Sequence, residues 1–311
     1  KQLVLLEKNT GKTIDSPKNP LILSVYPSHY DQLNDGIDPM INIGLNDETV
    51  EGLAESYHRP KFAYLTYLRF VVDFSESILD VDFPFIDQQV KRFMTLKRVD
   101  QLVDLEIKDI LELCSIIKNL PTQLKNVEFP QSTLDQLELI VMKKVALWQR
   151  DSLIDYRRSV EMDSKLGLSL IVREQKFSNL GEDSADVKII TRDPNSGDKK
   201  LIVSGFRNWQ RYSKIPFKQT YSKFTQFVDG SLLSQVNEMV QVLETYFCNG
   251  LELNLIIEDN KIFVNQVKLL KKTPRAELKI ALDLTSDINK DLKHTSQSIV
   301  LSNLKKYFNP E

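Results

Sequence analysis

The spacing of hydrophobic residues changes several times along the first half of the chain, and each spacing predicts a different element. Short apolar runs at 3–7 and 21–25 are typical of buried strands. Up to about residue 161, hydrophobic residues then recur at steps of three and four, which predicts amphipathic helices. The expected helices run from Asn46 or Asp47 to about 57, from Pro60 onward, over 85–97, over 106–119 and, after a linker at 119–130, over 131–161 from a cap at Ser132.

The second half of the chain returns to strand-like segments separated by turn residues. Strands are expected at 168–177, 186–191 and 201–205, and the turn at 193–198 should join the last two as a hairpin. A second hairpin is expected from 251–258 and 261–268 around Asp259 and Asn260. Helices are expected at 230–247 and over 274–308. Strands, a helical stretch, antiparallel hairpins and further helices together predict an α+β fold with two lobes.

Composition excludes several classes of protein. The chain has 41 Lys and Arg residues against 43 Asp and Glu residues, so a net charge of −2 gives no overall attraction to nucleic acid or anionic membranes. No run of 18 apolar residues occurs, so no membrane-spanning helix is expected. Cys114 and Cys248 are expected to be reduced thiols buried in the core.

Glycine usage excludes two common nucleotide-binding motifs. The ten glycines are scattered, and no Gly-x-Gly occurs anywhere. The dinucleotide fingerprint and the Walker-type P-loop both need glycines where backbone amides approach phosphate closely. The chain therefore has neither motif.

Searches for other chemistry assign no catalytic residue. His29, His58 and His294 lie in no metal-binding spacing, and no Gly-x-Ser-x-Gly occurs. Basic and aromatic residues alternate from Arg207 to Lys223, a composition that could stack on single-stranded nucleic acid. The favoured interpretation of this segment is a loop packed on its own lobe, so nucleic acid is not an expected partner.

A set of short motifs in one collinear order gives more. They include residues 42–47 (NIGLND), 50–54 (VEGLA), 61–70 (KFAYLTYLRF) and 191–197 (TRDPNSG). Together they resemble the nucleotide-binding half of pyruvate phosphate dikinase, an ATP-grasp family. The resemblance implies an ATP-grasp-like, two-lobed α+β fold with a helical insert. It divides the chain into a first lobe at 1–45 and 131–174, the insert at 46–130, a second lobe at 175–272 and a C-terminal helical extension at 273–311.

The chain departs from that family where the family binds ATP. Tyr26 stands where the family has an arginine that contacts the phosphates. The family's glycine loop is replaced by 184–190, in which Asp186 adds negative charge, and of the preceding glycine segment only Gly167 remains. The family's pair of metal-binding carboxylates aligns with Glu252 and Asn254, so one carboxylate is left.

The positions retained are few. Glu252, Gln266 and Lys268 match nucleotide or magnesium positions of the family, and Glu252 alone is a candidate metal ligand. The segment with the phosphorylated histidine has no match, so complete dikinase chemistry is not expected from these residues alone. Because the chain begins with Lys1, we expect a processed protein or part of a longer one.

Three functional hypotheses follow. The favoured one is a pseudoenzyme with no bound cofactor, kept as a structural or accessory subunit of a larger protein assembly, with the mitochondrial matrix or another organelle favoured over the cytoplasm. The second is a kinase-related module that still binds ATP and Mg²⁺ through Glu252, Gln266 and Lys268. The third is a nucleic-acid-associated component that uses the segment 207–223.

Overall fold

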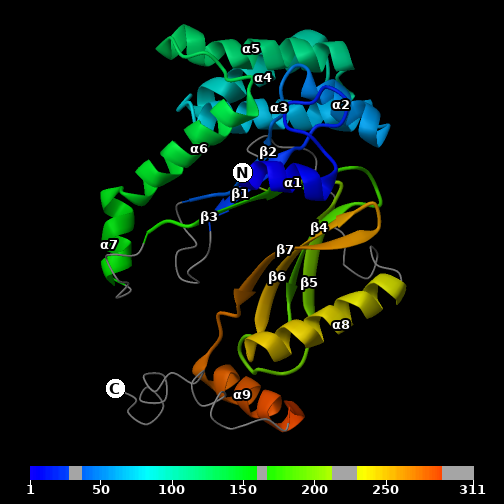
Figure 1. The fold of residues 1–311 in the computed structure, drawn as a ribbon, viewed down its shortest axis with the longest axis vertical. Coiled ribbons are helices and arrows are strands. Elements are labelled where there is room, and N and C mark those ends of the chain that lie inside the picture. Colours follow the sequence, from blue (N-terminus) through cyan, green and yellow to red (C-terminus); the bar gives the residue numbers. More distant parts are fainter. Residues whose placement is uncertain (28–36, 160–166, 212–229, 289–311) are drawn as a thin grey trace. The chain divides into compact units, whose positions relative to one another are not determined.

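The computed structural model describes residues 1–27, 37–159, 167–211 and 230–288. The chain divides into two compact units, one made mainly of Lys1–Gln175 and the other mainly of Lys176–Gln210 and the described residues from 230 onward. Each unit combines helices with one antiparallel sheet (Figure 1). The expectation of an α+β fold is therefore confirmed.

A three-stranded sheet organises the first unit. It contains β1 (Leu23–Pro27), β2 (Met40–Ile43) and β3 (Leu170–Glu174) in the order β2-β1-β3. Both pairings are antiparallel, and Leu23 lies opposite Ile43 on one side and Glu174 on the other. The strand expected at 21–25 is confirmed with a shift of two residues, whereas β2 was not expected.

The first element of the chain is a helix, α1 (Gln2–Thr10), so the strand expected at 3–7 is wrong. Half-buried side chains recur at residues 3, 6, 7 and 10, which is helical spacing, while Val4 and Leu5 are 65% and 51% exposed. Gly11 ends the helix in the left-handed conformation with φ 69°, and its N–H donates to the Glu7 carbonyl. The apolar run at 3–7 was too short to separate the two periods.

The helical stretch contains α2 (Thr49–Tyr57), α3 (Pro60–Ser77), α4 (Phe83–Lys97), the 3₁₀ turn η1 (Leu102–Asp104) and α5 (Ile107–Lys125). Figure 1 shows α3 and α5 side by side, and the two helices are in contact. Phe70 and Phe74 are fully buried in α3 and pack against Phe129, with ring centroids 6.1 and 5.2 Å away. These rings form part of the core on the buried side of the helix expected from Pro60 onward.

Two expected boundaries in this region are wrong. The linker expected at 119–130 begins later, because α5 continues through Pro121 to Lys125. Leu120 and Pro121 are both buried, and their apolar contact offsets the backbone hydrogen bond that a proline cannot donate.

The single helix expected at 131–161 is two helices, α6 (Thr133–Trp148) and α7 (Asp151–Ser159). Arg157 stabilises the end of α6, because its Nη1 donates to the Trp148 carbonyl at 2.9 Å and its guanidinium stacks 4.1 Å above the Trp148 ring. The Trp148 carbonyl therefore has a hydrogen-bond partner other than a backbone N–H of the helix.

The expected Ser132 cap is confirmed, since its side chain accepts from the Asp135 N–H.

A four-stranded antiparallel sheet organises the second unit, in the order β5-β4-β6-β7. Its strands are β4 (Ala185–Ile190), β5 (Ile202–Arg207), β6 (Leu251–Glu258) and β7 (Lys261–Leu269), so both expected hairpins are confirmed. One face packs on α8 (Gly230–Phe247), where Val187, Leu253 and Leu255 meet Val236 and Val240 (Figure 1). The last described helix is α9 (Pro274–Ile288), and the rest of the helix expected over 274–308 lies outside the described residues.

Candidate functional site

The face of the four-stranded sheet opposite α8 carries five polar residues that the sequence singled out, namely Asp186, Glu252, Asn254, Gln266 and Lys268. We call it the polar face. Side chains alternate along a strand, so Glu252 and Asn254 of β6 point away from Leu251 and Leu253, which belong to the core under α8. In the register of β6 and β7, Lys268 lies opposite Glu252 and Gln266 lies opposite Asn254. The structure therefore brings Glu252, Gln266 and Lys268 to one face of one sheet.

The side chains on this polar face bind one another. The Lys188 ammonium of β4 lies 2.9 Å from a carboxylate oxygen of Glu252. The Asn254 amide nitrogen donates to the side-chain oxygen of Gln266 at 2.9 Å. Two of the three expected nucleotide positions are thus already engaged by neighbouring side chains.

Asp186 lies on the same face and not in a loop. It is the second residue of β4, opposite Ile256, and only 4% of its surface is exposed. The segment expected to replace a phosphate-covering loop is therefore mostly a strand, because β4 begins at Ala185.

The residues present on the polar face do not fit Mg²⁺. This ion needs near-octahedral oxygen ligands, usually including one or two carboxylates. Glu252 is paired with Lys188, and the Asn254 Oδ1, which is buried without a hydrogen bond in the described part of the chain, is a neutral ligand. Among the described residues, no three His, Cys, Asp or Glu side chains are grouped so that they could hold a metal ion.

Tyr26 belongs to the first unit, where it lies on β1 with 6% of its surface exposed. The guanidinium of Arg173, on the neighbouring strand β3, stacks 4.1 Å from the centre of the Tyr26 ring. A positive charge therefore lies beside Tyr26, the residue that stands where the family has an arginine. Arg173 and Lys188 were both missed from the sequence, because only the strand register shows which residues they face.

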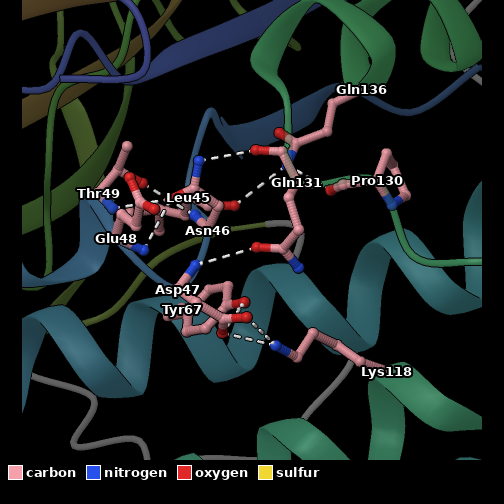
Figure 2. Close-up of polar contacts among 10 residues, drawn as sticks. All are labelled: Leu45, Asn46, Asp47, Glu48, Thr49, Tyr67, Lys118, Pro130, Gln131 and Gln136. Atoms are coloured by element: carbon pink, nitrogen blue, oxygen red, sulfur yellow. Dashed lines mark hydrogen bonds and ion pairs between the residues drawn. The ribbon is translucent and has the colours of Figure 1, made fainter. Parts of the chain in front are cut away.

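The motif at 42–47 stabilises the backbone of the first unit (Figure 2). The Asn46 side-chain oxygen accepts from the N–H groups of Glu48 and Thr49 at 2.9 and 2.7 Å, so Asn46, one of the two expected caps, bonds to the first amides of α2, whose N-cap residue is Glu48. Asp47 accepts from the Tyr67 hydroxyl at 2.9 Å and from the Lys118 ammonium at 2.7 Å. Burial, followed by the charge of Asp47, raises the pKa of Tyr67, so its hydroxyl stays a donor.

Gln136 of α6 completes this network. Its side-chain oxygen accepts from the Gly44 N–H at 2.7 Å, and its amide nitrogen donates to the carbonyls of Leu45 and Pro130 at 3.1 and 3.0 Å. Gly44 has φ 97°, and a Cβ there would lie 3.0 Å from the Thr133 hydroxyl. Every polar group in this network bonds to the protein itself, so the motif has a structural role.

The motif at 191–197 has the same character in the second unit. Arg192 is fully buried and binds Glu244 of α8 through Nε at 3.0 Å and Nη2 at 3.0 Å, and Asp283 of α9 through Nη1 at 3.1 Å. The Asp193 carboxylate accepts from the N–H groups of Ser196 and Asn195, which lowers the pKa of Asp193 below its usual value. The motif therefore fixes a turn and joins β4 to two helices.

The remaining candidates carry little chemistry. His58 is the exposed left-handed residue that ends α2, whereas His29 and His294 lie outside the described residues. Cys114 is a free buried thiol whose pKa is raised by burial, as expected, but Cys248 is only half-buried.

Of the basic aromatic segment 207–223, only 207–211 are described. There the centroid of the Trp209 ring lies 5.0 Å from that of the Phe206 ring, and the backbone N–H of Trp209 donates to the Ser178 carbonyl. In the described part of the chain, no helix is both long enough and apolar enough to cross a membrane.

Comparison with known proteins finds that the chain is similar to pyruvate, phosphate dikinases. The chain is 29% identical over 285 residues to pyruvate, phosphate dikinase of Clostridium symbiosum, a match that covers 91% of this chain and 33% of that enzyme. It is 27% identical over 293 residues to the pyruvate, phosphate dikinase of Entamoeba histolytica and 26% identical over 289 residues to pyruvate, phosphate dikinase 2 of Oryza sativa subsp. japonica, with 92% of this chain covered each time. No protein-family model matches the chain.

The chain spans about a third of the length of these relatives. The resemblance inferred from the motifs therefore holds along about nine tenths of the chain, in a divergent form.

Proposed function

We propose that this chain is a degenerate relative of the nucleotide-binding region of pyruvate phosphate dikinase, with an ATP-grasp-like fold that has lost its ligand. In this proposal, residues 1–45 and 131–174 form one lobe, 46–130 the helical insert, 175–272 the other lobe and 273–311 an extension. The chain acts without catalysis, as a structural subunit of a larger protein assembly, and we place that assembly in an organelle.

The ion pair between Lys188 and Glu252 is the observation that carries this proposal. Of the two positions that align with the family's metal-binding carboxylates, Glu252 alone keeps a carboxylate, and a divalent cation would have to displace the Lys188 ammonium from it. The next side chain along the strand, Asn254, is neutral and already donates to Gln266. A nucleoside triphosphate would therefore approach the sheet without the metal ion that offsets its negative charge. It would also lie beside the carboxylate of Asp186, which repels it.

Retained structural motifs support the same interpretation. The networks around Asn46 and Arg192 stabilise each unit through internal bonds alone. Such a fold can persist when ligand contacts are lost, because its stability does not depend on them.

The alternative function, a module that still binds ATP, is favoured by one observation. Arg173 lies over Tyr26, and Lys188 and Lys268 lie on the polar face of the other sheet, so positive charges remain in both units. Guanidinium and ammonium groups are the side chains that bind phosphate.

Thermal unfolding with Mg-ATP separates the two functions. A ligand that binds only the folded state adds RT ln(1 + [L]/Kd) to its stability, so 5 mM Mg-ATP adds about 3.7 kcal/mol at a Kd of about 10 µM but only about 0.4 kcal/mol at a Kd of about 5 mM. We expect the smaller effect. A shift of the larger size would replace this proposal with the alternative.

A restored variant makes the test two-sided. Tyr26→Arg, Asp186→Gly and Asn254→Glu together should produce nucleotide binding that calorimetry detects. The matched control, Tyr26→Phe, Asp186→Asn and Asn254→Gln, changes the same positions without adding phosphate or metal ligands. It should show no nucleotide binding by calorimetry. If the restored variant folds and still binds nothing, the degenerate-site explanation is wrong.

A further inference from the structure

A cavity of about 300 Å³ lies in the first unit, between α3, α4 and the segment 100–102 that follows α4 (Figure 1). Most of its wall is apolar and is formed by Val72 of α3, by Phe83, Ile86, Val90 and Met94 of α4, and by Leu102 of η1. The cavity shares no residue with the polar face of the four-stranded sheet, so its occupant is a separate question from the loss of nucleotide binding.

This cavity has a buried floor and an exposed rim. Val72 and Ile86 are fully buried and Leu102 is nearly so, whereas Lys91 and Asp100 are exposed. In another protein, an apolar cavity of about 150 Å³ holds one benzene molecule. A cavity of about twice that volume therefore fits a two-ring molecule that enters past the rim.

Two side chains of the wall favour an aromatic occupant. Phe83 and Met94 are both half-buried, so a molecule in the cavity can contact them. A phenyl ring attracts the edge or the offset face of another ring, and a thioether sulfur makes favourable contacts with ring edges. An aromatic body gains both contacts, and an aliphatic body of the same size gains neither.

The charged groups of the rim favour a cation. The cavity is lined by two carboxylates, Asp87 and Asp100, and by one ammonium, Lys91, which is paired with Asp87 one turn earlier in α4. In the described part of the chain, no ion pair involves Asp100. Lys97 and Arg98 follow in the sequence but do not line the cavity, and Lys97 is held by two carboxylates of α5 at 2.7 Å each. An ammonium group at the rim would therefore bond to Asp100, whereas an anion would be repelled by it.

We propose that this cavity binds a small organic cation with a two-ring aromatic body, of the arylalkylamine class. The rings lie over the buried floor against Phe83 and Met94, and the protonated amine pairs with Asp100 at the rim. The binding is reversible and does not depend on whether the chain binds ATP.

Met94 provides a site-specific readout, because a bound aromatic ring shifts the NMR signal of a nearby methyl group. The chain has five methionines, which can be labelled with ¹³C in their methyl groups. We expect tryptamine to move the Met94 signal with a Kd below about 0.5 mM, and to leave the signals of Met40 and Met142, which do not line the cavity, in place. Met94→Leu identifies the signal. No movement at about 5 mM tryptamine would overturn the proposal.

A filled cavity tests where the ligand binds. Val90→Phe places a ring in the space between the walls and should abolish the shift of the Met94 signal by tryptamine. The Met40 and Met142 signals report whether this variant keeps its native fold. If it does and tryptamine still moves the Met94 signal, the ligand binds elsewhere and the proposal is wrong.

Two analogues of tryptamine test the charge of the ligand. 3-Methylindole is neutral and indole-3-propionate is an anion, and both keep the two rings. At low ionic strength, where screening is weak, affinity should fall from tryptamine to 3-methylindole to indole-3-propionate, with a factor of at least about five between the first and the last. An anion that binds as tightly as tryptamine would contradict the assignment of a cation.

A matched pair of substitutions tests Asp100. Asp100→Asn should weaken tryptamine binding at least about twofold, as expected for an exposed ion pair, and change 3-methylindole binding by less than about 1.5-fold. Asp104 is an exposed carboxylate on η1 that does not line the cavity, so Asp104→Asn should affect neither ligand. Equal effects of the two substitutions on tryptamine would show that Asp100 does not bind the amine.

Discussion

The Lys188 ammonium lies 2.9 Å from the Glu252 carboxylate across the pairing of β4 with β6. Each of these residues is partly exposed, so the pair itself contributes little to stability. Its effect is chemical, because it occupies the carboxylate that a metal ion would need.

Removing this lysine and adding a second carboxylate should create metal binding. We expect Lys188→Met with Asn254→Glu to bind Mn²⁺ at submillimolar concentration, since two carboxylates two residues apart on one strand face can share an ion. Electron paramagnetic resonance of free Mn²⁺ measures this. Lys188→Met with Asn254→Gln is the control and should bind none. Mn²⁺ binding by the unmodified chain below 0.1 mM would contradict the prediction.

Arg192 should be the most costly arginine to replace in the second unit. Arg192→Met leaves Glu244, which is 3% exposed, as a buried charge without its partner, and such losses cost about 3–5 kcal/mol. Arg207→Met removes a partly exposed arginine 3.8 Å from Glu182 and should cost less than about 1 kcal/mol. Urea unfolding followed by circular dichroism gives both values. Equal losses would show that the buried pairs do not hold α8 and α9 to the sheet.

Gln136 and Gln131 offer a matched comparison in the first unit. Gln136→Leu leaves the Gly44 N–H and the Leu45 and Pro130 carbonyls without their partner, and unsatisfied buried groups cost about 1–3 kcal/mol each. We expect a loss of about 3 kcal/mol in the free energy of unfolding. Gln131 is exposed, so Gln131→Leu should cost less than about 1 kcal/mol. A larger loss for Gln131→Leu would reverse our ranking of the two residues.

The unfolding free energy should depend on pH through Lys144. Between about pH 8 and 10.5, the unfolded chain holds a proton on this lysine that the folded chain has released, so stability rises with pH in this window. The gain is about 3 kcal/mol, at about 1.4 kcal/mol for each unit of difference. Lys144→Met should lose this rise, which urea titrations at several pH values detect. Parallel pH curves for the two proteins would show that the folded-state pKa of Lys144 is ordinary.

The sequence predicted elements whose burial pattern is long and regular, such as α3, α8 and the hairpin of β6 and β7. It failed where distant residues decide the local structure. The end of α6 at Trp148 is stabilised by Arg157, nine residues later in the chain. The wrong prediction of a strand at 3–7 has a different reason, because that apolar run is too short to distinguish a helix from a strand. For the candidate site, the resemblance singled out Glu252, Gln266 and Lys268, and the strand register of the structure places them on one face. Lys188 and Arg173 could not be found, because strand register follows from tertiary packing.

The pairing of β1 with β3 has a consequence for the time course of synthesis. Leu23 and its partner Glu174 are about 150 residues apart in the sequence, and all the helices from α2 to α7 lie between them. At about 5–20 residues per second, a ribosome needs roughly 8–30 s to reach β3 after it has made β1. During that interval β1, whose five residues are all buried in the finished sheet, has only β2 as a partner, so one edge is open to other chains. The nascent protein is therefore most exposed to aggregation before its last strand of this sheet emerges.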